Sequence, residues 1–308
     1  MKPATEYLAE ALRSAGWGDR LRERAPLAPY TTYRIGGQAD LLIEATRSSE
    51  LVALWHLAQE HEVPCLVLGR GSNVLVSDRG VRGLVVVNRC QSRVLSAPGS
   101  LRAESGALLS ELAQETATAG WAGLEWSIGI PGSVGGAVVG NAGAHGGYVG
   151  DVLQSVTVLD HGRVRTLGAS ELGLGYRTSR FKAIASANGR PLILEATFAL
   201  RPGDAAAMGE QMAEWMRWRQ ERHPQEPSAG SVFKRTAQYP AGFLIDQAGL
   251  KGRRRGGAQV SPRHANFIVN HGNASARDVR GLMEEIQEVV QARFGVRLEL
   301  EIELIGEW

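Results

Sequence analysis

The sequence has few cysteines and no long apolar stretch. Cys65 and Cys90 are the only cysteines among 308 residues, too few for a disulfide framework, so we expect two reduced thiols in a cytosolic protein. No apolar run approaches the ~18 residues of a membrane-spanning helix, and the first residues lack the apolar core of a signal peptide. We therefore expect a cytoplasmic protein that does not span a membrane.

An excess of charge of one sign is also missing. Lys and Arg number 34 and Asp and Glu 32, a formal net charge of +2, which gives no support for an extended nucleic-acid-binding surface. No spacing of His, Cys, Asp and Glu predicts a metal site. The hydrophobic fraction of 44% and the charged fraction of 21% are ordinary for globular proteins. The length suffices for two domains, or three small ones, each with its own core.

Glycine, by contrast, is abundant in two segments. The run from Trp126 to Gly147 is dense in glycine, holds one proline and has almost no charge, a composition that neither a helix nor a central strand favours. The other segment, Gly69-Arg-Gly-Ser-Asn73, follows an apolar strand expected at 63–68, and successive N–H groups in such a turn can hold a pyrophosphate. Two such segments suggest a dinucleotide ligand, although tight turns alone would give the same composition.

Hydrophobic spacing predicts both helices and strands before residue 201. We expect helices at 4–24, from Ser48 or Ser49 to about 58, and at 108–119 before Gly120, and strands at 41–45, 63–68, 74–77, 84–87 and 192–200. A hairpin is expected at 152–167 around the turn Asp160-His-Gly162.

After Asp204, which is a suitable helix N-cap, long helices dominate the pattern. We expect helices at 205–223 and 242–248, a basic turn at 251–257 and a strand at 264–270. Ser275 and Asp278 form a capping-box pattern in front of an amphipathic helix that ends at Gly295. Residues 296–304 then alternate, with apolar residues at even positions, which predicts a strand carrying Arg297, Glu299, Glu301 and Glu303 on one face.

Five phrases are more specific than any spacing rule. They are Gly69-Arg-Gly-Ser-Asn-Val-Leu75, Gly129-Ile-Pro-Gly-Ser-Val-Gly-Gly136 with Asn141-Ala-Gly143, Tyr176-Arg-Thr-Ser-Arg-Phe-Lys182, Gly230-Ser-Val-Phe-Lys234 and Leu298-Glu-Leu-Glu-Ile-Glu-Leu-Ile-Gly306. In this order they resemble the UDP-N-acetylenolpyruvoylglucosamine reductase family, from about Thr31 to Glu307. The short segment between Lys182 and Pro191 is similar to the second, insertion-free type of that family.

The resemblance implies an α+β flavoenzyme. Its fold would be the two-subdomain FAD-binding fold of the PCMH and vanillyl-alcohol-oxidase type, followed by a C-terminal α+β substrate-binding domain. We expect FAD-binding subdomain 1 with the N-terminal helix at 1–87, FAD-binding subdomain 2 at 88–200 and the substrate-binding domain at 201–308.

The resemblance also implies which residues bind FAD. They belong to the two glycine-rich segments: Gly69, Arg70, Gly71, Ser72, Asn73, Gly129, Ile130, Pro131, Gly132, Ser133, Gly135, Gly136 and Asn141. NADPH would be the hydride-donating co-substrate, and it would use the same site as the substrate in turn.

The family reaction reduces the enolpyruvyl ether of UDP-N-acetylglucosamine to UDP-N-acetylmuramate for peptidoglycan synthesis, with hydride from reduced flavin. The resemblance assigns Arg177 to the substrate carboxylate, Ser231 to proton donation and Glu301 to the enol or the proton donor. From the residues alone, Arg177 could be a surface arginine, Ser231 a turn residue and Glu301 a solvated glutamate.

The remaining expectations concern the substrate. Candidate substrate-binding residues are Tyr176, Lys234, Arg235, Lys251 and His264, with Lys251 as the first candidate for the diphosphate; the cluster at 251–255 could equally be a solvated basic turn. The expected partners are the UDP-sugar enolpyruvyl ether and NADPH, with no nucleic acid, no membrane and a monomeric state.

One departure and two rival functions stay open. The family often has arginine where this chain has Glu303, which puts any role of that arginine in doubt. An oxidase of hydroxy acids or sugars could share the FAD fold, but it would lack the serine loop and the C-terminal glutamate strand. A nucleotide-sugar sensor could keep the fold without redox chemistry.

Overall fold

The computed structural model describes residues 3–184 and 189–308, so part of the segment between Lys182 and Pro191 lies outside the described residues. The chain forms two compact units, each assembled from separate stretches of sequence. The first unit contains Met1–Glu23, Leu41–Arg70 and Gly83–Trp218, and the second contains Arg24–Asp40, Gly71–Arg82 and Arg219–Trp308. The domain boundaries expected at 87/88 and 200/201 stay a prediction.

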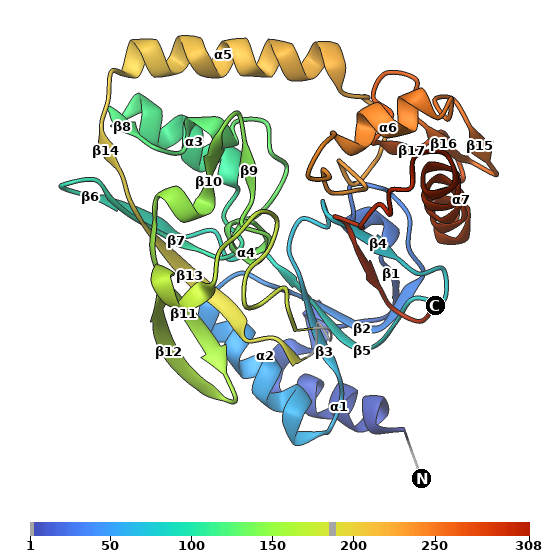
Figure 1. Cartoon of the computed structure of the whole chain (residues 1–308). Helices are drawn as coiled ribbons and strands as arrows, with labels where there is room; N and C mark the ends of the chain where they lie inside the picture. Colours follow the sequence, from blue (N-terminus) through green and yellow to red (C-terminus); the bar gives the residue numbers. More distant parts are fainter. Residues whose placement is uncertain (1–2, 185–188) are drawn as a thin grey trace. The chain divides into compact units, whose positions relative to one another are not determined.

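A five-stranded antiparallel sheet forms the centre of the first unit (Figure 1). Its strand order is β12-β11-β13-β7-β6, with β6 Arg93–Ser96, β7 Ser100–Glu104, β11 Leu153–Asp160, β12 Arg163–Gly168 and β13 Leu192–Ala199. The hairpin expected around Asp160 is confirmed: Asp160 pairs with Arg163, and His161 and Gly162 both have positive φ, as a tight two-residue turn requires.

Helices bury one core against this sheet. They are α3 Leu109–Thr118, α4 Val134–Val139 and α5 Ala205–Arg222. The start of α5 is capped as expected, because the Asp204 carboxylate accepts the N–H groups of Ala206 and Ala207. Met208 and Met212 of α5 are buried in the same apolar cluster as Leu112 of α3.

A second sheet has the strand order β1-β2-β5-β3. Its strands are β1 Arg22–Pro26, β2 Gln38–Ala45, β3 Cys65–Leu68 and β5 Val81–Asn88, and β3 pairs with β5 in parallel. Helices α1 Ala4–Leu12 and α2 Ser48–Glu60 lie side by side next to these strands (Figure 1). Leu12 and Leu54 are completely buried in the cluster that contains Ile43, and each such side chain contributes about 2 kcal/mol through burial.

The helix expected at 4–24 is wrong in its second half. Regular α-helix ends at Leu12, and a π-helical turn at Arg13–Trp17 and a 3-10 turn at Gly18–Arg20 lead into β1. Gly16 has φ +86°, a left-handed conformation that a continuing right-handed helix cannot contain. The helix-like spacing of apolar residues in the sequence therefore continues past Leu12, where the α-helix ends.

The second unit combines helices with two small sheets. α6 Ala241–Gln247 and α7 Ala276–Phe294 pack with the antiparallel strands β15 Arg254–Arg255, β16 Ala258–Val260 and β17 Ile268–Asn270. β4 Val74–Val76 pairs in parallel with β18 Glu303–Ile305, and the two strands lie side by side in Figure 1. The basic turn expected at 251–257 thus contains a short strand, and the strand expected at 264–270 begins only at Ile268.

Local signals set both ends of α7. The Ser275 hydroxyl accepts the Asp278 N–H, and the Asp278 carboxylate accepts the Ser275 N–H, so the expected capping box is confirmed. At the other end Gly295 has φ +68°, a conformation that favours glycine. The apolar stripe buries Val279, Leu282 and other residues of the helix in the core of the unit.

The C-terminal strand expected at 296–304 is much shorter. Only Glu303–Ile305 is regular strand, although Leu298 and Ile302 are buried while Arg297 and Glu299 are exposed. The alternation therefore describes the burial of residues 297–299 and 302, but Glu301 and Glu303 are half-buried like Leu300 and Leu304. Residues 296–302 also have no continuous neighbouring strand. Within residues 3–184 and 189–308, no helix combines the length and the apolar character needed to cross a membrane.

Candidate active site and cofactor site

The loop 69–73 follows the parallel strand β3, where the backbone turns sharply. Gly71 has φ +61°, and a Cβ there would lie 2.3 Å from the carbonyl oxygen of Tyr30. In the described part of the chain, the N–H groups of Arg70, Gly71 and Ser72 donate no hydrogen bond to protein. Neighbouring unused N–H groups in a turn suit a phosphate anion, so this loop fits the pyrophosphate of FAD.

The second glycine-rich segment is fixed to its own unit by backbone hydrogen bonds. The N–H of Leu109 donates to Gly132 O at 3.1 Å, and the N–H of Gly135 donates to Ser105 O at 2.8 Å. A Cβ at Gly69 would lie 2.5 Å from Ser133 Oγ, so the two glycine-rich segments are in direct contact there. A single extended ligand could contact both segments, which fits the expected cofactor.

Asn141 connects this segment with the loop of Arg177. Its side chain is buried, donates from Nδ2 to Gly175 O at 2.9 Å and accepts the N–H of Gly150 at 2.9 Å. Gly175 and Thr178 pair through both backbone hydrogen bonds. A tight turn with Tyr176 and Arg177 at its tip results, and Asn141 anchors it.

The guanidinium of Arg177 is held on a second hairpin. Arg177 has φ +54°, and its Nη2 donates to Gly143 O at 2.8 Å. Gly143–Ala144 (β9) pairs with Gly147–Tyr148 (β10). His145, between these strands, stacks on Trp215 of α5 with ring centroids 4.7 Å apart and planes 9° apart. The predicted catalytic arginine is therefore oriented by the carbonyl of Gly143, which the β9–β10 pairing holds in place.

In the second unit, the serine loop and the C-terminal segment lie against one another. The N–H of Glu301 donates to Val232 O at 2.8 Å, and the N–H of Lys234 donates to Glu299 O at 2.9 Å. Ser231 and Glu301, predicted from phrases about 70 residues apart, thus belong to two adjacent backbone segments.

Asn266 holds the serine loop, and we did not predict this role from the sequence. It is buried, its Oδ1 accepts the N–H of Phe233 at 3.0 Å, and its Nδ2 donates to Phe233 O at 2.8 Å. Its own carbonyl accepts the N–H of Val232 at 2.8 Å. The only sequence signal is an asparagine within an otherwise apolar phrase.

Asn73 is also bound to the segment that contains Glu301. Its Nδ2 donates to Glu301 O at 3.2 Å, and its carbonyl accepts the N–H of Glu303 at 2.9 Å. The last residue of the predicted phosphate loop therefore fixes the backbone at Glu301. Glu303 begins β18 opposite Val74.

The basic candidates in the second unit have carboxylate and histidine neighbours. Lys234 Nζ lies 3.2 Å from Glu299 Oε2, and Lys251 Nζ lies 2.8 Å from Asp246 Oδ2. Burial lowers the pKa of His264 below its ordinary value, a backbone hydrogen bond opposes this, and the charge of Lys251 lowers the pKa further. His264 Nδ1 accepts the N–H of Asn266, so the neutral imidazole presents Nε2–H as a donor.

The candidate residues divide between the two units. The first unit contains Gly69, Arg70, the segment 129–141, Tyr176 and Arg177, and the second contains Gly71, Ser72, Asn73, Ser231, Lys234, Arg235, Lys251, His264 and Glu301.

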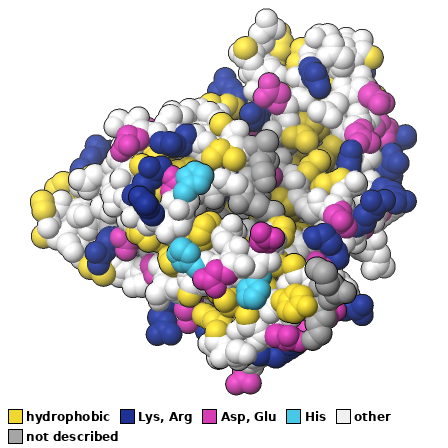
Figure 2. Space-filling view, turned by 90° about the horizontal axis from the view of Figure 1, so that it is seen from below, with side chains coloured by type: hydrophobic (Ala, Val, Ile, Leu, Met, Phe, Trp, Pro, Cys, Tyr) yellow, Lys and Arg dark blue, Asp and Glu magenta, His cyan; other side chains and the backbone are white. Residues whose placement is uncertain are grey.

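On the face drawn in Figure 2, Lys and Arg side chains are interspersed with Asp and Glu.

Family comparison covers both parts of the chain. Residues 222–305 match the model of the UDP-N-acetylenolpyruvoylglucosamine reductase C-terminal domain, and residues 39–168 match a FAD binding domain. The chain is 44% identical over 309 residues to UDP-N-acetylenolpyruvoylglucosamine reductase 2 of Symbiobacterium thermophilum, which covers 99% of this chain and 98% of that relative. It is 40% identical over 309 residues to the reductase of Geobacillus kaustophilus, with full coverage of both.

A solved structure agrees with these relatives. The reductase of Thermus caldophilus has a TM-score of 0.78 and 38% identity to this chain, and it covers 92% of this chain and 99% of its own. These similarities confirm the expected α+β fold with a FAD-binding part followed by a C-terminal domain of the same family.

Proposed function

We propose that this chain, which belongs to the UDP-N-acetylenolpyruvoylglucosamine reductase family and is an FAD-dependent oxidoreductase, uses NADPH to reduce the enolpyruvyl ether of UDP-N-acetylglucosamine. The product is UDP-N-acetylmuramate, a precursor of peptidoglycan. The reaction consumes NADPH and one proton. Two hydrogens add across the carbon–carbon double bond, one as hydride at the terminal carbon and one as a proton at the carbon beside the carboxylate.

The cofactor belongs at the two glycine-rich segments. Bound FAD supplies hydride transfer between NADPH and the substrate, which would use one site in turn. The N–H groups of Arg70, Gly71 and Ser72 are placed to bind its pyrophosphate. The contact between Gly69 and the Ser133 side chain keeps the second segment next to this loop.

Arg177 binds the substrate carboxylate in this proposal. Negative charge develops on the carbon beside that carboxylate when hydride is added, and a guanidinium stays charged and can bind both carboxylate oxygens. The hydrogen bond from Nη2 to Gly143 O orients the group before substrate arrives, and such preorganisation is the usual source of electrostatic catalysis.

Ser231 delivers the proton, and Glu301 orients it or binds the enol. A serine hydroxyl is protonated at neutral pH, but it donates efficiently only where neighbouring groups stabilise the alkoxide. The charge of Lys234, three residues along the same loop and 3.2 Å from Glu299 Oε2, would supply part of that stabilisation. Asn266 and the backbone pairing with Glu301 hold the loop in place.

The uridine diphosphate is assigned to the basic residues of the second unit. Lys251 and the Nε2–H of His264 provide donors close to each other, and Arg235 and Lys234 add charge. Tyr176 is the remaining predicted substrate contact, and the centre of its ring lies 5.6 Å from Arg177 Cζ. The protein would work in the cytoplasm as a monomer.

The pairing of the Ser231 loop with the Glu301 segment carries this proposal most directly, because backbone hydrogen bonds join two segments that are distant in the sequence and carry the two predicted proton-transfer residues. The test is an incubation of the purified protein with the enolpyruvyl UDP-sugar and NADPH labelled with deuterium at its transferable position. Mass spectrometry and NMR should find one deuterium in the methyl group of the product. A parallel reaction in deuterated water should place one solvent deuterium on the adjacent carbon. Unlabelled carbons in both reactions would refute the proposed chemistry.

A further inference from the structure

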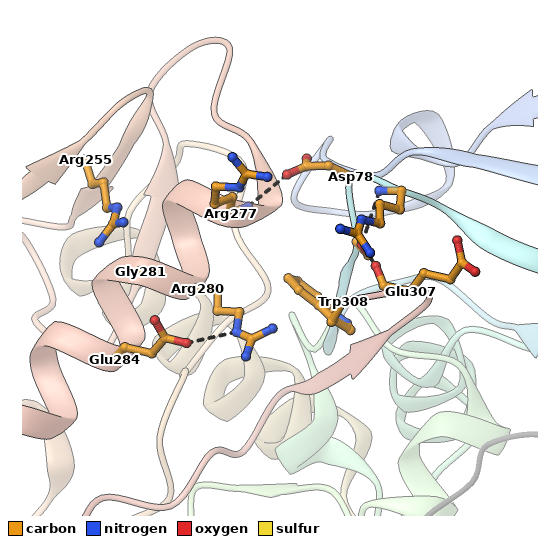
Figure 3. A pocket seen from close by; sticks show the side chains of 10 residues that line it. Asp78, Arg255, Arg277, Arg280, Gly281, Glu284, Glu307 and Trp308 are labelled. Carbon is orange, nitrogen blue, oxygen red and sulfur yellow. Dashed lines mark hydrogen bonds and ion pairs between the residues drawn. The ribbon is translucent and has the colours of Figure 1, made fainter.

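A pocket of about 250 Å³ lies in the second unit, and none of its lining residues is assigned to the reaction above. Figure 3 shows its walls. They come from the turn after β4, the end of β15, the first turns of α7 and the segment after β18, and the lining residues are Ser77, Asp78, Arg79, Arg255, Arg277, Arg280, Gly281, Glu284, Glu307 and Trp308.

Hydrogen bonds fix these walls to one another. The carboxylate of Asp78 accepts the N–H groups of Ala276 at 2.8 Å and Arg277 at 3.0 Å, so the turn after β4 is bound to the start of α7. Ser77 Oγ donates to Glu307 O, and the N–H of Glu307 donates to Gly80 O at 3.0 Å. The segments that line the pocket are therefore held together by hydrogen bonds within the unit.

The lining has four arginines and three carboxylates, so its side chains carry one positive charge in excess. Of its three carboxylates, Asp78 caps α7, Glu284 pairs with Arg280 at 2.9 Å, and Glu307 lies 3.5 Å from Arg82. In residues 3–184 and 189–308, no carboxylate lies within ion-pair distance of Arg79 or Arg277, which also line the pocket. Arg255 differs from them, because its charge helps to lower the pKa of the Asp278 carboxyl. The helix N–H groups are already occupied by Asp78 and Ser275, so recognition there depends on the guanidinium groups.

Gly281 gives one of these arginines its position. A Cβ at Gly281 would lie 2.3 Å from Arg255 Cζ, so the guanidinium rests directly on the backbone of α7. Glycine within a helix costs about 1 kcal/mol relative to alanine. At this position it leaves room for a cation at the pocket wall.

Trp308 adds a planar apolar surface. Arg280 Cζ lies 5.2 Å from the centre of its ring, and 37% of the residue is exposed. In Figure 3 the indole lies between Arg280 and Glu307. An indole beside several guanidinium groups can stack on an aromatic base while arginine binds phosphate.

We propose that this pocket binds a mononucleotide-sized phosphorylated anion, with its phosphate on Arg79 and Arg277 and its ring on Trp308. The volume suits such a ligand. A phosphate alone would use the arginines, and a nucleotide would use the indole as well.

Calorimetric titrations of the FAD-loaded protein with guanosine 5′-monophosphate, and separately with inorganic pyrophosphate, test this site. We expect the nucleotide to bind with Kd below ~1 mM. Arg277→Ala should weaken binding of both probes at least ~10-fold, the size of one lost charge-assisted hydrogen bond. Trp308→Ala should weaken nucleotide binding by ~5-fold or more and leave pyrophosphate unchanged.

Two variants separate this pocket from the proposed active site. Lys251→Ala should leave nucleotide binding within about twofold, and Arg79→Ala should reproduce the loss seen with Arg277→Ala. Arg79 and Arg277 are both exposed, so their replacement leaves the core intact. Absence of binding to the wild-type protein, unchanged binding in both arginine variants, or loss of binding in Lys251→Ala would each overturn the proposal.

Discussion

The N–H of Glu301 donates a 2.8 Å hydrogen bond to the carbonyl of Val232, the residue that follows Ser231. This bond joins the loop of the proposed proton donor to the segment of the proposed catalytic glutamate. Asn73 fixes the other side of that segment through Glu301 O at 3.2 Å. The positions of Ser231 and Glu301 are therefore linked through backbone, and changes in either segment should affect the same chemical step.

Replacement of Ser231 by alanine should stop proton delivery without affecting flavin reduction. Proton transfer by a positioned side chain contributes ~10²–10⁴-fold to a rate, so the step with the enolpyruvyl substrate should slow by at least ~100-fold. Single-turnover absorbance measurements of each half-reaction check this. The matched control is Ser228→Ala in the same loop, which should behave like wild type. Equal rates for Ser231→Ala and the control would exclude the proton-donor role.

Arg177→Lys should preserve charge but lose the planar donor geometry. An ammonium cannot bind both carboxylate oxygens in the same way, and we expect turnover to fall by ~10²–10³-fold. Steady-state kinetics with the enolpyruvyl substrate measure the loss. Arg180→Lys, an exposed arginine of the same phrase, serves as control and should stay within about twofold. Near-native activity of Arg177→Lys would contradict the carboxylate contact.

Asn266→Ala should affect the catalytic step through the serine loop. Both side-chain bonds to buried Phe233 are lost, which should cost about 2–4 kcal/mol of unfolding free energy. As a positioning residue, Asn266 should slow reduction of the enolpyruvyl substrate and leave flavin reduction by NADPH near normal.

Asn270→Ala provides the comparison for this variant. Asn270 also makes side-chain hydrogen bonds, to the backbone of Tyr33, Gly272 and Ala274, and its loss should cost similar stability in denaturant titrations. In Asn270→Ala, the ratio between the rates of the two half-reactions should be the same as in the wild-type protein. Equal kinetic defects in both asparagine variants would show that Asn266 has only a structural role.

Acid stability should depend on Glu50. Hydrogen bonds from Arg20 lower its pKa to about 2 against the opposing effect of burial, with help from the Thr46 N–H and Arg47. Because the folded-state pKa lies below the unfolded value, the contribution is present above the unfolded pKa and is lost as pH falls from ~5 towards ~2. We expect it to be about 2–3 kcal/mol after discounting for the partial exposure of Arg20.

Denaturant titrations near pH 6 and pH 3 measure this contribution. Glu50→Gln should lower the free energy of unfolding near pH 6 and reduce its dependence on pH. Glu284→Gln, which removes an exposed pair with Arg280, should change stability by less than about 1 kcal/mol. An unchanged pH dependence in Glu50→Gln would show that other carboxylates dominate acid unfolding.

Elements with strong local signals were predicted well. The capping box of Ser275 and Asp278 and the stripe through Val279 and Leu282 define α7 without reference to the rest of the chain. The turn at Asp160 is equally local. The N-terminal helix was predicted too long because the left-handed conformation of Gly16 depends on how the chain enters β1.

The residues of the candidate site could be predicted only from the phrases shared with the family. The residues that hold them in place could not be predicted, because they act through tertiary contacts. Alternation at 296–304 predicted the burial of Leu298 and Ile302, but not that Glu301 and Glu303 are half-buried. The pairing of Leu300 with Phe233 is a single long-range bridge, and most of this segment lies outside regular strand. Asn266 could not be identified as the support of the serine loop, because its partner Phe233 is 33 residues away. The stack of His145 on Trp215 joins residues still farther apart in the sequence.

Anaerobic stopped-flow absorbance of the purified protein follows both half-reactions of the proposed reductase. The protein is mixed first with NADPH and then with the enolpyruvyl UDP-sugar. We expect loss of the visible flavin band in the first mixing and its return in the second only when the sugar is present. A colourless protein would contradict the cofactor assignment. A flavin band restored by oxygen but not by the sugar would contradict the proposed reductase and favour an oxidase.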